Sequence, residues 1–93
     1  GYGLVLPNTF TPNGDGLNDT IRPWYKCMSS IEVSIYDTFG SLLYVESSTG
    51  EIYGWDGLIN GRPAENGNYI IVVRAVSLYG QEIELNGPVT LVR

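Results

Sequence analysis

The sequence predicts an all-β fold, an immunoglobulin-like β-sandwich of about seven short antiparallel strands. Segments rich in valine, isoleucine and tyrosine recur at intervals of about ten residues along the chain. Clusters of glycine, asparagine, aspartate and proline separate these segments and supply turns. No segment of useful length repeats its apolar residues with the period of a helix.

Composition narrows the class of protein further. The chain has 93 residues and a hydrophobic fraction of 43%, which suits one domain with a packed core. Its net charge is −5, with only five basic residues, and this argues against nucleic acid or an anionic membrane surface as a partner. There is no histidine, and the single cysteine excludes an internal disulfide or a thiolate metal cluster. No apolar run is long enough to span a membrane.

The clearest strand is predicted at Ile31–Tyr36, where apolar residues at odd positions alternate with more polar ones. Asp37–Ser41 is predicted as a turn in which Gly40 suits a positive φ, and Leu42–Val45 returns as the partner strand of a hairpin. Leu4–Leu6 is expected to form an edge strand, because the proline that follows it cannot donate to a ladder.

Residues 20–25 combine three large apolar side chains with a proline that limits regular strand pairing. A lone cysteine two residues further on is usually a small apolar core residue. The side chains that we expect to bury in this region are Ile21, Trp24, Tyr25 and Cys27.

Residues 52–56 place apolar and aromatic side chains at alternate positions. Trp55 is expected to fill the core, because indole is the largest apolar body that a small sandwich can bury. Two Asn-Gly pairs then indicate turns between residues 60 and 68. Tyr69–Val76 is apolar at nearly every position, which predicts a central strand buried on both faces.

The C-terminal part is predicted to hold two more strands. Glu82–Leu85 alternates, with Ile83 and Leu85 facing inward. Residues 86–88, Asn-Gly-Pro, are expected to break this strand, and Val89–Val92 forms the last one.

The loop Pro7–Thr20 stands out from the rest of the chain, because it holds two prolines, two glycines, three asparagines and two aspartates. Its apolar residues Phe10 and Leu17 argue against a free linker. Loops on a rigid scaffold commonly carry recognition. The candidate recognition residues are Pro12, Asn13, Gly14, Asp15, Gly16, Asn18 and Asp19.

The same loop has oxygen-bearing residues at alternate positions followed by glycine, the spacing of a calcium loop. An EF-hand is excluded, because Thr11 and Arg22 stand where the first aspartate and the bidentate glutamate are needed. Two interpretations remain: Asx turns with glycines at positive φ, which need no cofactor, or a weak Ca²⁺ site. The candidate ligands are Asn13, Asp15, the Leu17 carbonyl and Asp19.

Five motifs occur along the chain in a fixed order: PNTFTPNGDGLNDTI, IEVSIYDTFGSLLY, Trp55-Asp56-Gly57 with Asn60-Gly61-Arg62-Pro63, Asn66-Gly67 before Tyr69, and Gly87-Pro88-Val89-Thr90-Leu91-Val92-Arg93. Together they resemble the gliding-motility-associated C-terminal domain, the type B sorting domain of the type IX secretion system of Bacteroidetes. The resemblance covers nearly the whole chain. Where the family often has Arg-Trp before the first hairpin glycine, this chain has Thr38 and Phe39, and we expect Phe39 to keep the hydrophobic contact.

The resemblance implies that residues 1–93 are a single C-terminal sorting domain of a larger exported protein, with the cargo upstream. It implies recognition by the outer-membrane translocon and surface-attachment components, and delivery of the cargo to the cell surface or medium. The residues themselves agree with a binding module, because they show no catalytic constellation, and we expect no enzyme activity. Structural roles are expected for Trp55, Asp56, Gly57, Gly67 and Tyr69.

Two other classes of function remain open on the residues alone. An adhesive or carbohydrate-binding module would use exposed aromatic side chains as a platform, with Tyr36, Tyr44, Tyr53 and Tyr79 as candidates. A glycosidase would need two carboxylates across one cleft, with the pairs Asp15 and Asp19 or Asp56 and Glu65 as candidates. Acidic residues in turns have an ordinary structural explanation, which weakens the enzyme hypothesis.

Overall fold

The computed structural model describes residues 1–12, 14 and 19–93. Among these residues it contains nine strands and no helix, so the all-β prediction is confirmed and the strand count is higher than expected. None of them lies in a helix that is long and apolar enough to cross a membrane. The strands are β1 (Gly3–Val5), β2 (Thr9–Phe10), β3 (Trp24–Lys26), β4 (Met28–Tyr36), β5 (Leu42–Ser48), β6 (Leu58–Ile59), β7 (Arg62–Pro63), β8 (Gly67–Ser77) and β9 (Glu82–Leu91).

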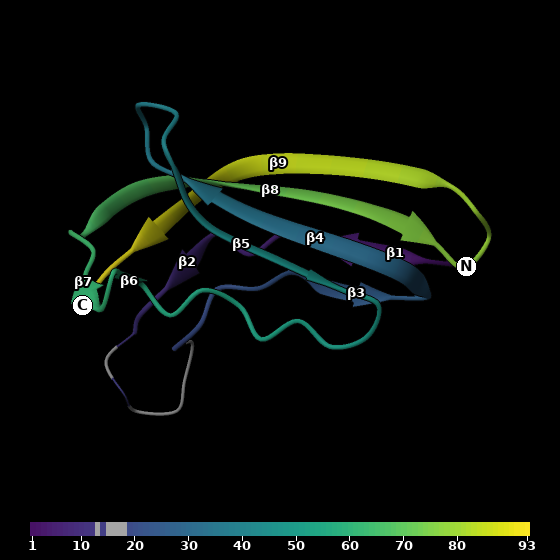
Figure 1. The fold of residues 1–93 in the computed structure, drawn as a ribbon, viewed down its shortest axis with the longest axis horizontal. Helices are drawn as coiled ribbons and strands as arrows, with labels where there is room; N and C mark the ends of the chain where they lie inside the picture. Colours follow the sequence, from purple (N-terminus) through teal and green to yellow (C-terminus); the bar gives the residue numbers. More distant parts are fainter. Residues whose placement is uncertain (13, 15–18) are drawn as a thin grey trace.

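Five strands form the main sheet, in the order β2-β9-β8-β4-β5 (Figure 1). Its neighbours are antiparallel except for β2 and β9, which are parallel, so the expectation of purely antiparallel strands is wrong at this one pair. β1 and β3 form a separate two-stranded ribbon, and β6 and β7 form a short hairpin.

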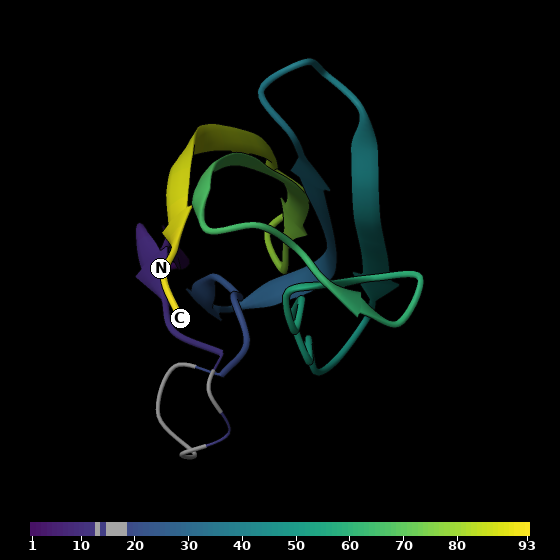
Figure 2. The same cartoon turned by 90° about the vertical axis from the view of Figure 1, so that its left-hand side faces the viewer.

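The β1–β3 ribbon and the segment 49–57 lie against one face of the main sheet and make the second layer of the sandwich (Figure 1 and Figure 2). Within the ribbon, Leu4 is paired with Tyr25, and both side chains pack on the core. The inward side chains of the sheet alternate along each strand, and directly opposed pairs such as Val33 and Val73 are fully buried. The buried apolar residues are Phe10, Ile21, Ile31, Val33, Ile35, Ile52, Trp55, Ala64, Tyr69, Ile71, Val73, Ala75, Val89 and Leu91.

β8 lies at the centre of the sheet, as predicted, but the prediction that both of its faces are buried is wrong. Its inward residues are buried, whereas Ile70 on the outer face is 38% exposed and Arg74 is also exposed. The reason is that, within the described part of the chain, the second layer lies on the other side of the sheet (Figure 2). Apolar residues on the outer face are therefore shielded only by their neighbours on the adjacent strands.

The predicted break at residues 86–88 is wrong, because β9 continues through Pro88. The backbone nitrogens of Thr90 and Val92 donate to the carbonyls of Asn8 and Phe10, on the side of β9 that faces β2. Backbone groups alternate in direction along a strand, so the nitrogen of Pro88 points to that same side. The proline therefore removes no hydrogen bond from the ladder between β9 and β8.

Three residues expected in the core are more exposed than predicted. Trp24 is 57% exposed, because Tyr25 takes the inward position of the ribbon and neighbouring side chains point to opposite faces. Cys27 is half-buried at a turn between β3 and β4, where its φ is 59°. Leu85 lies on the inward face of β9, directly opposite Val73, but it remains exposed.

Residues 52–56 form no strand, although the burial of Trp55 is confirmed at 0% exposure. The backbone of Trp55 makes a single bridge to Ile21, with N–O distances of 2.8 and 3.0 Å. The indole ring lies 5.6 Å from the ring of Phe10 and 5.3 Å from that of Tyr69, in an edge-on arrangement with the latter. Its Nε1 donates to the Leu58 carbonyl at 3.0 Å. Trp55 thus joins the second layer to the main sheet.

We predict that Trp55→Ala lowers the free energy of unfolding by about 3–5 kcal/mol, because it removes a fully buried aromatic side chain and leaves a cavity. Trp24→Ala is the matched control, since the same chemical change at an exposed site is expected to cost about 1 kcal/mol or less. Equilibrium denaturation in urea measures both. Equal losses in the two variants would show that Trp55 is not the centre of the core.

Candidate recognition surface

Four segments that are distant in the sequence meet at one end of the domain. They are residues 10–12, 55–57, 64–69 and 91–93, and each contains part of a sequence motif described above. Figure 1 shows that this end also holds the β6–β7 hairpin. The N-terminus lies at the opposite end of the longest axis. We call this region the motif end.

Arg93 connects three of these segments. Its guanidinium donates to the Gly57 carbonyl at 2.9 Å and to the Ala64 carbonyl. Its backbone nitrogen donates to Asn66 Oδ1 at 3.2 Å. An arginine can serve two carbonyls at once because its donors form a planar fork. This side chain, two residues after the last strand, therefore fixes two loops that the sequence places about thirty residues upstream.

Gly57 sits where only glycine fits. Its φ is 80°, a region that other residues rarely adopt. An added Cβ would lie 2.9 Å from Arg93 Nη2 and 3.2 Å from Pro12 Cγ, both too close. Its carbonyl also accepts the Ala64 N–H at 2.8 Å. The contact with Pro12 brings the base of the Pro7–Thr20 loop to the motif end.

The other predicted structural residues lie in the same place. Asp56 Oδ1 accepts the Leu58 N–H at 3.0 Å, so this exposed carboxylate shapes a turn. The Tyr69 hydroxyl donates to the Glu65 carbonyl at 2.6 Å, and burial raises the pKa of Tyr69 above its ordinary value. Gly67 begins β8 with a φ of 147° and has open space around it.

Part of the predicted recognition loop can be placed. Asn13, Asp15, Gly16, Leu17 and Asn18 lie outside the described residues. Pro12 contacts the Gly57 region as above, and the Gly14 N–H donates to Asp19 Oδ1 at 3.1 Å. Gly14 has a φ of 79°, as the turn interpretation expects. Of the four candidate calcium ligands only Asp19 is described, so the calcium site stays a prediction.

The tip of the β4–β5 hairpin presents an exposed aromatic side chain. Asp37 Oδ1 accepts the backbone N–H groups of Phe39 and Ser41, each at 2.9 Å, and Gly40 has a φ of 89°. This turn directs Phe39 outward, where it is 93% exposed, so the expected hydrophobic contact is wrong. A cavity of about 330 Å³ separates the tip from residues 65–69.

A carboxylate network that the sequence did not reveal holds the segment before Trp55. Glu46 Oε1 accepts the Tyr44 hydroxyl at 2.6 Å and the Gly54 N–H at 2.9 Å, and Oε2 accepts the Tyr53 N–H at 2.9 Å. Burial alone would raise the pKa of Glu46, but these hydrogen bonds outweigh it and lower the pKa. Burial, followed by the bond to Glu46, raises the pKa of Tyr44 well above its ordinary value. In the sequence, the one sign of this network is the charged residue Glu46 at a position of β5 whose side chain faces inward.

The four tyrosines proposed as a ligand platform do not share one surface. Tyr44 faces inward in the network with Glu46, whereas Tyr36 lies on β4 with its side chain toward the outer face. Tyr53 is exposed in the second layer, and Tyr79 is exposed in the turn between β8 and β9. The geometry therefore gives no support to an aromatic platform built from these residues.

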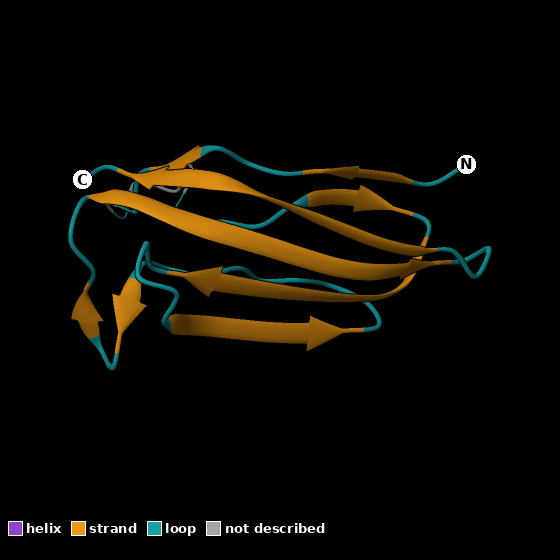
Figure 3. Cartoon of the chain, turned by 90° about the horizontal axis from the view of Figure 1, so that it is seen from above, coloured by secondary structure: helices purple, strands orange, loops and turns teal. Residues whose placement is uncertain are grey.

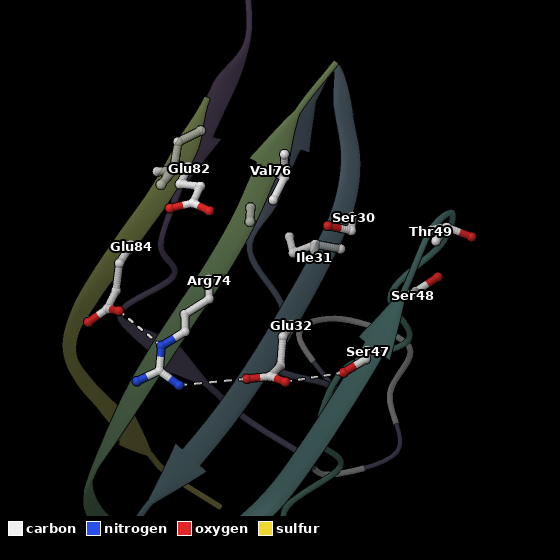
Figure 4. A pocket seen from close by; sticks show the side chains of 12 residues that line it. Ser30, Ile31, Glu32, Ser47, Ser48, Thr49, Arg74, Val76, Glu82 and Glu84 are labelled. Carbon is white, nitrogen blue, oxygen red and sulfur yellow. Dashed lines mark hydrogen bonds and ion pairs between the residues drawn. The ribbon is translucent and has the colours of Figure 1, made fainter. Parts of the chain in front are cut away.

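A larger cavity of about 950 Å³ lies across β5, β4, β8 and β9 (Figure 4). Arg74 lies between two glutamates there, with nitrogen–oxygen distances of 2.9 Å to Glu84 and 3.8 Å to Glu32. Ser47 Oγ lies 3.5 Å from the other oxygen of Glu32. These charged groups are exposed, so their ion pairs stabilise the fold little.

We predict that Gly57→Ala lowers the free energy of unfolding by about 2–4 kcal/mol, because it combines an unfavourable φ with two close contacts. Gly61→Ala isolates the first effect, because Gly61 has a φ of 79° and nothing lies near its absent Cβ. That control should cost about 1 kcal/mol. Chemical denaturation of both variants gives the difference, and similar values would mean that the contacts at Gly57 relax freely.

If the loop binds Ca²⁺, the ion stabilises the folded state by mass action, by about 2.7 kcal/mol at a hundredfold excess over the dissociation constant. The melting temperature should then rise with added Ca²⁺, fall with a chelator, and no longer respond in Asp15→Ala. Differential scanning calorimetry measures each case. A melting temperature of the parent domain that ignores Ca²⁺ would leave the Asx-turn interpretation.

Comparison with known proteins agrees with the motifs. Over residues 4–90 the chain matches the family described as the CHU_C type IX secretion signal domain. No curated protein matches the chain significantly. A signal of this kind interacts with the secretion machinery and directs its cargo toward the cell surface or medium. The description of the family names a role in secretion. The chain belongs to the family of type IX secretion signal domains and is a C-terminal sorting signal.

Proposed function

We propose that this domain is the folded export signal of a larger exported protein, recognised as a surface by the outer-membrane translocon and by surface-attachment components. The family match supports a role in type IX secretion. The finer statement, that the fold and not a linear peptide is the signal, rests on how the motifs are arranged in space.

The observation that carries the proposal is the motif end. Arg93 donates from its guanidinium to the Gly57 carbonyl and from its backbone nitrogen to Asn66 Oδ1. Gly57 also lies against Pro12, so four motifs come together only in the folded chain. A linear signal would need one contiguous segment. The loop that begins at Pro12 is held on this rigid base, which is the usual arrangement for a recognition loop.

The termini suit a domain that follows its cargo. The N-terminus lies at the opposite end of the domain from Arg93 and the motif end (Figure 1). A cargo joined before Gly1 therefore leaves the motif end open to the translocon. The described residues share one core cluster, which supports residues 1–93 as a single unit.

Charge indicates the kind of receptor surface. The net charge of −5 favours a basic patch on the translocon and an association that weakens as salt is added. The same charge disfavours nucleic acid as a partner. Outer-membrane attachment or release to the medium would follow from the components that meet the domain after export.

We propose no catalytic activity. The Asp56 carboxylate is hydrogen-bonded within its own turn, and Glu65 contributes its backbone carbonyl to Tyr69. Neither role resembles two carboxylates facing each other across a substrate. The dispersed tyrosines likewise favour a sorting domain over a carbohydrate-binding module.

Export of a reporter tests the proposal. Gly1–Arg93 is fused behind a signal peptide and a fluorescent protein in a bacterium that has this secretion system. We expect the reporter to reach the surface or medium only when the translocon is intact. Deletion of Val89–Arg93 should abolish export, because it removes the end of β9 and the Arg93 contacts.

A second variant separates recognition from folding. Asp15→Ala in the loop should weaken export while the melting temperature measured without Ca²⁺ stays unchanged. Gly61→Ala, in a turn of the β6–β7 hairpin, should leave export unchanged. A parent reporter that remains in the periplasm with a folded domain would overturn the proposed function.

A further inference from the structure

β5 is the outer strand of the main sheet and has a neighbour on one side only, β4 (Figure 3). The backbone groups that face the open side follow from the alternation of hydrogen bonds across the sheet. The backbone nitrogens of Thr90, in β9, and of Val92, just after β9, donate toward β2. Carrying this alternation through the registers of β8 and β4 places the N–H and C=O groups of Val45 and Ser47 on the open edge.

These groups have no hydrogen-bond partner in the part of the chain that the structure describes. Water satisfies them in the isolated domain, but a row of unpaired backbone groups is also a template for another strand. Val45 is 52% exposed on this edge, so an added strand would bury apolar surface as well as gain hydrogen bonds.

The two edges of the sheet differ in how they are protected. At the other edge β2 covers the end of β9, and Pro88, Glu82 and Glu84 occupy the remainder. Prolines and charged side chains at an edge discourage further pairing. β5 contains no lysine, arginine or proline. Its one charge, Glu46, points inward and is held by hydrogen bonds from three groups of the protein.

Charge selects the occupant of this edge. Glu32 lies beside Ser47, at 3.5 Å, and a long basic side chain opposite this small serine can reach it. Arg74, the basic residue among the labelled side chains of the cavity, is already paired with Glu32 and Glu84 (Figure 4). A second copy of the domain would bring another net charge of −5 to the edge. A basic strand from a different protein meets no such repulsion.

We propose that β5 accepts an extended, basic segment of the type IX secretion machinery as a sixth strand of the sheet. The Val45 and Ser47 backbone groups bind this segment, and Glu32 attracts its charge. This inference rests on the proposed function. It adds a second contact with the machinery, separate from the one proposed at the motif end. Pairing through the main chain uses backbone atoms that every residue carries. It therefore requires few particular side chains on the signal.

Proline at position 45 tests the backbone contact. Val45→Pro removes an N–H that faces the open edge and leaves the bonds between β5 and β4 in place. Val45→Thr is the control, because it keeps the N–H and a β-branched side chain. In the reporter assay we expect export to fall about tenfold in Val45→Pro and to stay within about twofold of the parent in Val45→Thr. Circular dichroism and melting temperature establish that each variant is folded.

Two variants of opposite charge at the same exposed site test the inference even if Val45→Pro unfolds. Val45→Lys should reduce export about tenfold by repelling a basic segment, whereas Val45→Glu should retain it. Export of folded Val45→Pro at the parental rate, or equal export of the lysine and glutamate variants, would overturn the inference alone. Failure of the parent fusion to be exported would overturn the proposed function instead. Sedimentation that shows a parent dimer dissolved by Val45→Pro would assign the edge to a second copy and overturn the inference.

Discussion

The burial of one indole ring holds the two layers of this domain together. A chain of this length buries a small core, so a single tryptophan supplies a large share of the apolar contact. Trp55 contacts Phe10 from β2 and Tyr69 from β8, and its Nε1 donates to the backbone of the next turn. The glycine at position 57 and the arginine at position 93 complete the same region. The residues of the motif end, which we propose for recognition, are therefore positioned by the core itself.

Local patterns predicted the parts of the fold that local physics decides. The alternation in β4, the hairpin turn at Gly40 and the burial of Trp55 are all as expected. The failures depend on layers that the sequence does not show. An apolar run predicted two buried faces for β8, but only one face of the sheet is covered in the described residues. Pro88 is harmless because of the direction of its nitrogen, which depends on strand order.

At the candidate site, too, the features set by neighbouring residues could be predicted, and those set by distant residues could not. The Trp-Asp-Gly and Asn-Gly motifs could be found by eye, because turn chemistry depends on adjacent residues. The partners of Arg93 could not, since Gly57 lies 36 positions away in the sequence. The carboxylate of Glu46 was missed for the same reason, and so was the open edge at Val45. Which strand lies at an edge depends on the order of strands in the sheet. The sequence of seven or more short strands does not determine that order.

The parallel pairing of β2 with β9 has a consequence for biosynthesis. Thr9 and Phe10, near the start of the domain, pair with Thr90 and Leu91. This ladder cannot form until those later residues have been synthesised. Contacts between such distant positions form late, after most of the chain entropy has been lost. A polypeptide that stops before these residues has neither the closed sheet nor the Arg93 bridge. On the proposed function, the cell would then export only chains that have been synthesised through the end of β9, so the folded signal also reports that the whole sheet is present.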